Sequence, residues 1–92
     1  MKYGDIINRK KVVVCFKGFN DVFFNEYLIA QELDELGFNY FVIDVEKNPE
    51  LSQAINIQKT PTFIVYKEGQ TIARVQENFA DFIELLKEGE KC

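Results

Sequence analysis

Two cysteines are the most reactive side chains of this sequence, and their spacing limits the chemistry they can perform. Cys15 lies inside an apolar run, and Cys92 stands at position 92 of the 92 residues. Thiols that exchange disulfides or bind a metal as a pair lie a few positions apart. These two are far apart in the sequence, and histidine, the commonest general base and metal ligand, is absent. The sequence therefore predicts neither a dithiol centre nor a metal site.

Each cysteine also has a simple structural explanation. Strand alternation within the β-branched run at 11–16 places Cys15 in the core, where it acts as a small hydrophobic residue. Cys92 follows Glu88 and Glu90 in a polar tail, and these carboxylates disfavour a thiolate. The alternatives remain that Cys15 is a displaced nucleophile, and that Cys92 forms an intermolecular disulfide or acts as a tethered thiol.

The segments that must position these residues alternate between strand and helix. Runs of β-branched and aromatic residues predict the strands, and Gly37 and Asn48-Pro49 mark a helix end and a helix start. Glu68-Gly69-Gln70 is typical of a tight hairpin turn. We expect strands at 11–16, 39–45, 62–67 and 71–76, and helices from about 21 to 36, from 49 and from 79.

This order, β-α-β-α-β-β-α, predicts an α/β fold. Strands joined by a helical crossover run parallel with a right-handed connection, and the closing hairpin adds an antiparallel edge. The expected architecture is a four-stranded mixed sheet with helices on both faces. We expect one domain over residues 1–92, with residues 1–10 as a short N-terminal arm that forms a helical turn or two around Tyr3 to Ile7.

Composition and charge narrow the classes of partner. The chain is 47% apolar, which is typical of a globular protein, and its net charge is −4 without a basic stripe. We therefore expect no binding to nucleic acids or to anionic membranes. The sequence contains no apolar run of signal-peptide or membrane-spanning length. These observations predict a cytoplasmic protein with reduced thiols.

The element order, with a proline opening the third strand, resembles the thioredoxin superfamily, which includes thioredoxins and glutaredoxin-type domains. The likeness extends from Lys11 onward. The segment 44–49, Asp-Val-Glu-Lys-Asn-Pro, is similar to the end of a family strand and the helix start after it. The segment 57–69 is similar to the family's cis-proline strand and its Lys-x-Gly hairpin, which implies that Pro61 is a cis-proline.

The resemblance fails at the positions that carry the family's chemistry. Alignment without gaps places Asn20 and Phe23 where the two redox cysteines stand, and Phe19 where the family has tryptophan. An amide can cap a helix but cannot attack a disulfide, and Phe23 cannot resolve a mixed disulfide. The usual dithiol mechanism is therefore unavailable at this position.

The resemblance implies a binding role for the remaining site. Family members offer the backbone of the residue before the cis-proline to an extended ligand, and that residue is Thr60 here. Phe19, Phe23 and Phe24 either pack inward or form an exposed aromatic docking patch, which can also serve as a homodimer contact. Lys17 is either solvated or pairs with a ligand carboxylate.

Three functional hypotheses follow. The leading one is a non-catalytic module that binds a protein or peptide in a redox or protein-folding context, without a cofactor. The second is an atypical thiol-disulfide oxidoreductase that uses Cys15 or Cys92. The third is a glutathione-binding, glutaredoxin-like protein that uses Lys17 and Thr60.

Overall fold

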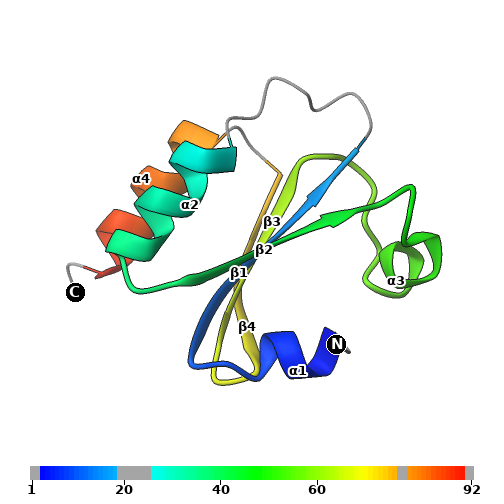
Figure 1. The fold of residues 1–92 in the computed structure, drawn as a ribbon, viewed down its shortest axis with the longest axis horizontal. Coiled ribbons are helices and arrows are strands. Elements are labelled where there is room, and N and C mark those ends of the chain that lie inside the picture. The colour runs from blue at the N-terminus through cyan, green and yellow to red at the C-terminus, as the bar shows by residue number, and fades with distance from the viewer. Residues whose placement is uncertain (1–2, 19–25, 77–78, 91–92) are drawn as a thin grey trace.

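The computed structural model describes residues 3–18, 26–76 and 79–90, and it contains helices and strands in the predicted order (Figure 1). The predicted helical turn in the N-terminal arm is confirmed as helix α1. The elements in chain order are α1 (Tyr3–Ile7), β1 (Lys11–Lys17), α2 (Glu26–Glu35), β2 (Asn39–Asp44), α3 (Pro49–Ala54), β3 (Thr62–Lys67), β4 (Gln70–Val75) and α4 (Phe79–Glu90).

The four strands form one mixed sheet in the order β2-β1-β3-β4. Strand β1 runs parallel to β2 and antiparallel to β3, and β3 and β4 form the closing hairpin. Helices α2 and α4 cover one face of the sheet, and α1 and α3 lie on the other side (Figure 1). The predicted α/β architecture, with helices on both faces of a mixed sheet, is therefore confirmed.

Strand β1 is the centre of the molecule. Its residues 12–16 all have an exposed fraction of 0%. Val13 and Cys15 belong to the hydrophobic core under α2 and α4, whereas Val12, Val14 and Phe16 belong to the core on the side of α1 and α3. An unbroken apolar run is what a strand buried on both faces requires, because successive side chains point to opposite faces.

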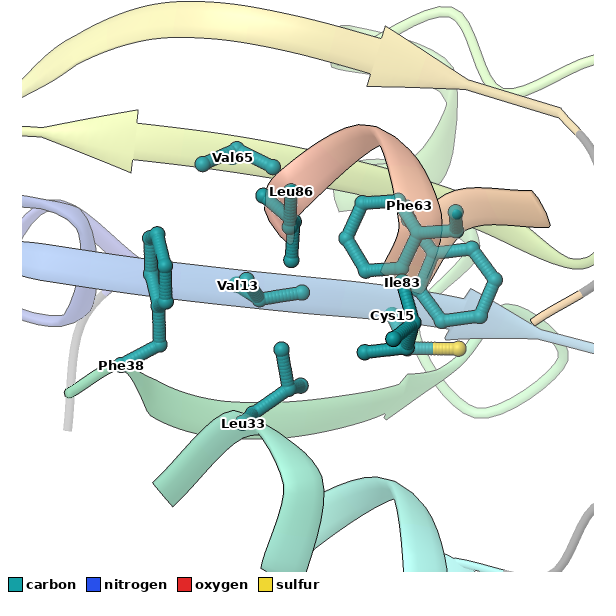
Figure 2. Packing of buried hydrophobic residues seen from close by; sticks show 9 residues of the cluster. Val13, Cys15, Leu33, Phe38, Phe63, Val65, Ile83 and Leu86 are labelled. Carbon is teal, nitrogen blue, oxygen red and sulfur yellow. The ribbon is translucent and has the colours of Figure 1, made fainter. Parts of the chain in front are cut away.

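The core under α2 and α4 is built around a stacked pair of aromatic rings. The ring centroids of Phe63 and Phe82 lie 4.4 Å apart, with 12° between the ring planes. Burial of such large side chains contributes more to folding than most other contacts of a small domain. Figure 2 shows this cluster, which also contains Val13, Cys15, Leu33, Phe38, Val65, Ile83 and Leu86.

Helix α2 ends in a glycine motif, as the sequence predicts. Gly37 has a φ of 84°, a conformation that residues with a Cβ rarely adopt. Phe38 donates its backbone N–H to the carbonyl of Leu33 at 2.9 Å, and Gly37 donates to Asp34 at 3.0 Å. These two bonds satisfy carbonyls that the helix end leaves without partners. They also direct the chain into β2.

A lysine from the start of β1 completes this helix end. The Lys11 ammonium donates to the carbonyl of Leu36 at 3.0 Å and lies 4.4 Å from the centre of the Phe38 ring. A cation at a helix C-terminus is favourable because it faces the negative end of the helix dipole. The contact therefore joins the first strand to the end of α2.

The hairpin between β3 and β4 is one residue tighter than predicted. Glu68 and Gly69 have φ values of 53° and 85°, so the turn consists of these two residues, and β4 begins at Gln70 rather than at Thr71. Two consecutive residues with positive φ form the turn whose twist matches a two-residue hairpin. The register then shifts between Val65 and Tyr66, which is a β-bulge.

Candidate functional site

The candidate site lies where β1 ends and β3 begins. The last Cα pair between these strands is Phe16 with Thr62, so the next residues, Lys17 and Pro61, lie level with each other. The Thr60–Pro61 peptide bond is cis. Thr60 is exposed, Pro61 is half-buried, and Lys17 is half-buried. The structure thus brings three of the predicted site residues, Lys17, Thr60 and Pro61, to one end of the sheet.

Thr60 presents a short piece of backbone at this end of the sheet. Among the described residues, neither its N–H nor its C=O has a hydrogen-bond partner. An N–H and a C=O that both lack a partner on one residue can pair with an extended ligand in the way that two strands pair. The chemistry available at Thr60 is therefore backbone recognition, which requires no reactive side chain.

A buried hydroxyl closes the turn that carries Thr60 and Pro61. Thr62 has an exposed fraction of 0%, and its hydroxyl donates to the carbonyl of Lys59. A buried hydroxyl is costly without a partner, so this bond both satisfies Thr62 and fixes the path of residues 59–62. The sequence identifies Thr62 only as the first residue of a strand.

Arg74 of β4 contacts the segment between α3 and the candidate site. The sequence does not predict this contact. Its guanidinium donates to the carbonyl of Ile55 at 2.7 Å and also to the carbonyl of Asn56. Asn56 has a φ of 61° just after α3 ends, and its carbonyl points to β4 through this bond. An arginine on a strand gives no sequence signal for a contact 18 or 19 residues away.

The start of α3 differs from the prediction in its detail. Asn48 occupies the N-cap position and Pro49 is in the first turn, but the Asn48 side chain makes no capping bond. Its amide donates instead to the carbonyl of Asp44 at 3.0 Å. Ser52 is buried and donates to the carbonyl of Asn48 at 2.9 Å. The side chain of Asn48 therefore stabilises the β2–α3 connection rather than the free N–H groups of the helix.

Cys15 lies in the core, as strand alternation predicts. It has an exposed fraction of 0% and lies opposite Phe63 of β3 and Val42 of β2. Figure 2 shows its side chain among the apolar groups of the α2–α4 core. A thiol in apolar surroundings is disfavoured as a thiolate, and its burial keeps an external disulfide away. This environment gives the thiol a packing role.

The other predicted site residues lie outside the described part of the chain. They are Phe19, Asn20, Phe23, Phe24 and Cys92. Their proposed roles as an aromatic docking surface, a replaced cysteine position and a second thiol remain predictions from the sequence.

The described residues contain neither a metal cluster nor a membrane-spanning helix. Across residues 3–18, 26–76 and 79–90, no three His, Cys, Asp or Glu side chains come together as a metal site. In the same ranges, no helix combines the length and apolar character needed to cross a bilayer.

Comparison with known proteins identifies the scaffold. The family model for thioredoxin matches residues 25–88. Thioredoxin from Staphylococcus saprophyticus is 32% identical over 68 residues, which cover 62% of this chain and 65% of the relative. Thioredoxin from Staphylococcus aureus is 31% identical over the same shares of both chains. The match thus spans less than two thirds of the length of these relatives.

Solved structures agree with this fold. A mutant thioredoxin from Entamoeba histolytica superposes with a TM-score of 0.74 at 15% identity, covering 91% of this chain and 85% of that one. Thioredoxin f2 from Chlamydomonas reinhardtii gives a TM-score of 0.71 at 21% identity, with 95% and 88% covered. At these identities the likeness establishes the architecture.

Proposed function

This chain belongs to the thioredoxin family, and we propose that it uses the family scaffold to bind an extended protein or peptide segment without catalysing disulfide exchange. The observation that carries the proposal is the exposed residue Thr60 beside cis-Pro61, at the end of β1 and the start of β3. The backbone N–H and C=O of Thr60 have no hydrogen-bond partner among the described residues. We expect the module to act in the cytoplasm, in a redox or protein-folding context, and without a cofactor.

The backbone of Thr60 supports a strand-like mode of binding. Its N–H and C=O can pair with a ligand backbone, and the ligand side chains then lie on either side of the sheet end. Such binding depends on main-chain geometry, so it survives the replacement of the redox cysteines by Asn20 and Phe23. We propose Phe19, Phe23 and Phe24 as the apolar contacts, and Lys17 as the partner of a ligand carboxylate.

The surrounding bonds favour a preformed site. The Thr62 hydroxyl bond to Lys59 and the Arg74 bonds to Ile55 and Asn56 hold the chain on both sides of Thr60. A segment that is fixed before binding loses little conformational entropy when the ligand arrives. A short peptide can therefore gain measurable affinity from few contacts.

The position of Cys15 argues against the alternative of an atypical oxidoreductase that uses this thiol. Disulfide exchange needs an accessible thiolate, and Cys15 has an exposed fraction of 0% in an apolar core. Cys92 remains the other thiol in this hypothesis. Reduction of insulin and of a glutathione mixed disulfide tests both thiols, with the native chain assayed beside Cys15→Ser and Cys92→Ser. We expect no activity above background, and activity that one substitution removes would identify a nucleophile.

Binding is tested directly with a displayed library of random decapeptides. We expect enriched peptides to shift the amide resonance of Thr60 in titrations followed by NMR. The double variant Phe23→Ala/Phe24→Ala should lose most of this binding, whereas Ile72→Ala, at a half-exposed position of β4, should retain it. Binding that is equal in all three proteins and leaves Thr60 unshifted would refute the proposed site.

Glutathione is a second candidate ligand because Lys17 and Pro61 lie level at the same strand ends. A lysine there can face a glutathione carboxylate while Thr60 pairs with the tripeptide backbone. Millimolar glutathione should then shift the amides of Lys17 and Thr60, and an unchanged spectrum removes this candidate.

A further inference from the structure

Helix α1 lies on the sheet with all of its residues at least partly exposed. It has five residues, from Tyr3 to Ile7, and none of them is buried. A helix of this length is marginal in water, so its stability depends on the surface that it packs against. Tyr3, Ile6 and Ile7 pack against the core on the side of α1 and α3. Docking of α1 is therefore a local equilibrium that can shift while the sheet stays folded.

The two ends of the N-terminal arm have different anchors. At its C-terminal end, the backbone N–H of Glu68 in the β3–β4 turn donates to the carbonyl of Lys10 at 3.1 Å. At the start of α1, the Tyr3 hydroxyl is hydrogen-bonded to that of Tyr66, and the Tyr3 ring centroid lies 6.1 Å from that of Phe16. Tyr3 thus anchors the start of α1 to the sheet.

Phe16 connects this anchor to the candidate site. It has an exposed fraction of 0%, and it forms the last Cα pair between β1 and β3, opposite Thr62. Opposed residues of an antiparallel pair point to the same face, so the Phe16 ring and the Thr62 side chain are neighbours. The Thr62 hydroxyl donates to the carbonyl of Lys59, the residue before Thr60. A shift of the Phe16 ring therefore disturbs the bond that fixes the backbone at Thr60.

Arg74 provides a second connection between the arm and the site. Its guanidinium donates to the carbonyls of Ile55 and Asn56, at the start of the segment between α3 and β3. Burial raises the pKa of Tyr3, and so does the Tyr66 hydroxyl, whereas the charge of Arg74 acts in the opposite direction. Tyr3 and Arg74 are thus close enough to interact, and Tyr3 adjoins both groups of contacts that support the site.

We propose that Tyr3 is a positioning residue for the peptide site at Thr60, because docking of α1 through Tyr3 holds Thr60 in its binding geometry. This inference rests on the proposed function, in which an extended peptide pairs with the backbone of Thr60. Coupling between two sites is reciprocal, so a bound peptide stabilises docked α1 by the factor by which docked α1 tightens peptide binding. The N-terminal arm is in this way a regulatory element, since displacement of α1 weakens peptide binding.

Substitutions at Tyr3 test the coupling and separate the ring from the hydroxyl. The probe is the decapeptide most enriched on the native chain, and NMR titration at the Thr60 amide measures its affinity. Tyr3→Ala removes the contact with Phe16 and should weaken binding about fivefold or more. Tyr3→Phe keeps the ring and should retain most of the affinity. Leu36→Ala, at a half-buried position packed on the opposite core, controls for a general loss of stability and should bind like the native chain.

A stabilised helix tests the direction of the effect. Gly4 lies inside α1, and among the described residues a Cβ added there comes within 4 Å of nothing beyond its chain neighbours and its own helix backbone. Gly4→Ala therefore favours the helix without a clash, since glycine is the poorer helix former. Ile7→Ala removes an apolar contact of α1 and should weaken peptide binding. Gly4→Ala added to Ile7→Ala should recover part of the lost affinity.

Hydrogen exchange measures the reciprocal effect in the native chain. The backbone N–H of Asn8 donates to the carbonyl of Gly4 at 3.2 Å, so its exchange rate reports the opening of α1. Saturation with the decapeptide should slow this exchange by about the factor by which Tyr3→Ala weakens binding.

The outcomes distinguish the coupling from the proposed function. Circular dichroism establishes that each variant is folded. If the decapeptide shifts Thr60 but binds the native chain and Tyr3→Ala equally, the coupling is wrong and the proposed function stands. Equal losses of affinity in Tyr3→Ala and Leu36→Ala attribute the effect to general stability and also overturn the coupling. A native chain in which no library peptide shifts Thr60 refutes the binding site, and this inference with it.

Discussion

The hydroxyl groups of Tyr3 and Tyr66 lie 2.7 Å apart and join α1 to β3. The two rings meet edge to face, with centroids 6.1 Å apart, and Tyr3 also contacts Phe16 of β1. Burial and the Tyr66 hydroxyl raise the pKa of Tyr3 above its ordinary value of 10. A short helix such as α1 is marginal by itself, so this contact contributes to holding it on the sheet.

Tyr3→Phe should lower the free energy of unfolding by about 1 kcal/mol, because it removes one part-buried hydrogen bond and keeps the ring. Tyr66→Phe removes the same bond and should lower the free energy of unfolding by a similar amount. The double variant should then cost less than the sum of the two single changes. Urea denaturation measures all three, and fully additive losses would show that the two hydroxyls do not interact.

The same pair predicts a dependence of stability on pH. The pKa of Tyr3 is raised in the folded state, so above about pH 10 the unfolded chain releases this proton first. The stability that Tyr3 contributes is therefore complete below about pH 10 and is lost as the pH rises further. Urea denaturation between about pH 9 and pH 11 should show a steeper decline for the native chain than for Tyr3→Phe. Parallel declines would contradict the raised pKa.

Lys11→Met should destabilise the fold by about 1 kcal/mol, because it removes the bond to Leu36 and the charge over Phe38 but keeps an apolar stem. The exposed neighbour Lys10 provides the matched control, since Lys10→Met makes the same change in net charge. Chemical denaturation of both variants measures the difference. Equal effects would show that net charge, rather than the helix-end contact, is responsible.

Arg74→Met should weaken peptide binding at Thr60 and lower stability by about 1 kcal/mol, because the carbonyls of Ile55 and Asn56 lose their charged donor. Arg74→Lys keeps the charge but cannot donate to both carbonyls with the geometry of a guanidinium. It should therefore recover only part of the peptide binding and part of the stability. Gln70→Met, on the same strand, is the control. Titration with a library-selected peptide and urea denaturation test this prediction, and full recovery by lysine would exclude a geometric role.

Cys15 should resist iodoacetamide in the folded protein and react once the chain is unfolded in denaturant. Its exposed fraction is 0%, and burial in an apolar core disfavours the thiolate. The Cys92→Ser variant leaves Cys15 as the one thiol, so mass spectrometry reads its modification without ambiguity. Rapid alkylation under native conditions would revive the oxidoreductase hypothesis.

The fold was predictable because the decisive signals are local. The uninterrupted apolar run of residues 12–16 indicates a strand buried on both faces, and Gly37 marks the end of α2. The helix-strand alternation then fixes the topology, since crossover connections have one hand. The turn between β3 and β4 is one residue shorter than the sequence predicts because Glu68 adopts a positive φ, which its side chain does not suggest.

The partners of several polar side chains were not predictable. Lys11 reaches Leu36, Arg74 reaches Ile55, and Asn48 turns to Asp44 instead of capping α3. Each side chain is long or polar enough to choose among several partners, and only the assembled fold decides which partner is near. For the candidate site, the motif around Pro61 was sufficient to locate the backbone of Thr60, whereas the bonds that support it came from the structure.

Strand β1 contributes side chains to both hydrophobic cores of this molecule. Val13 and Cys15 pack on one side of it, and Val14 and Phe16 pack on the other. Neither core can open while β1 keeps its place in the sheet, because the strand would then expose the apolar side chains of one face to water. We therefore expect the two layers to melt together in a single cooperative transition, so that a defect in either core lowers the melting temperature of both.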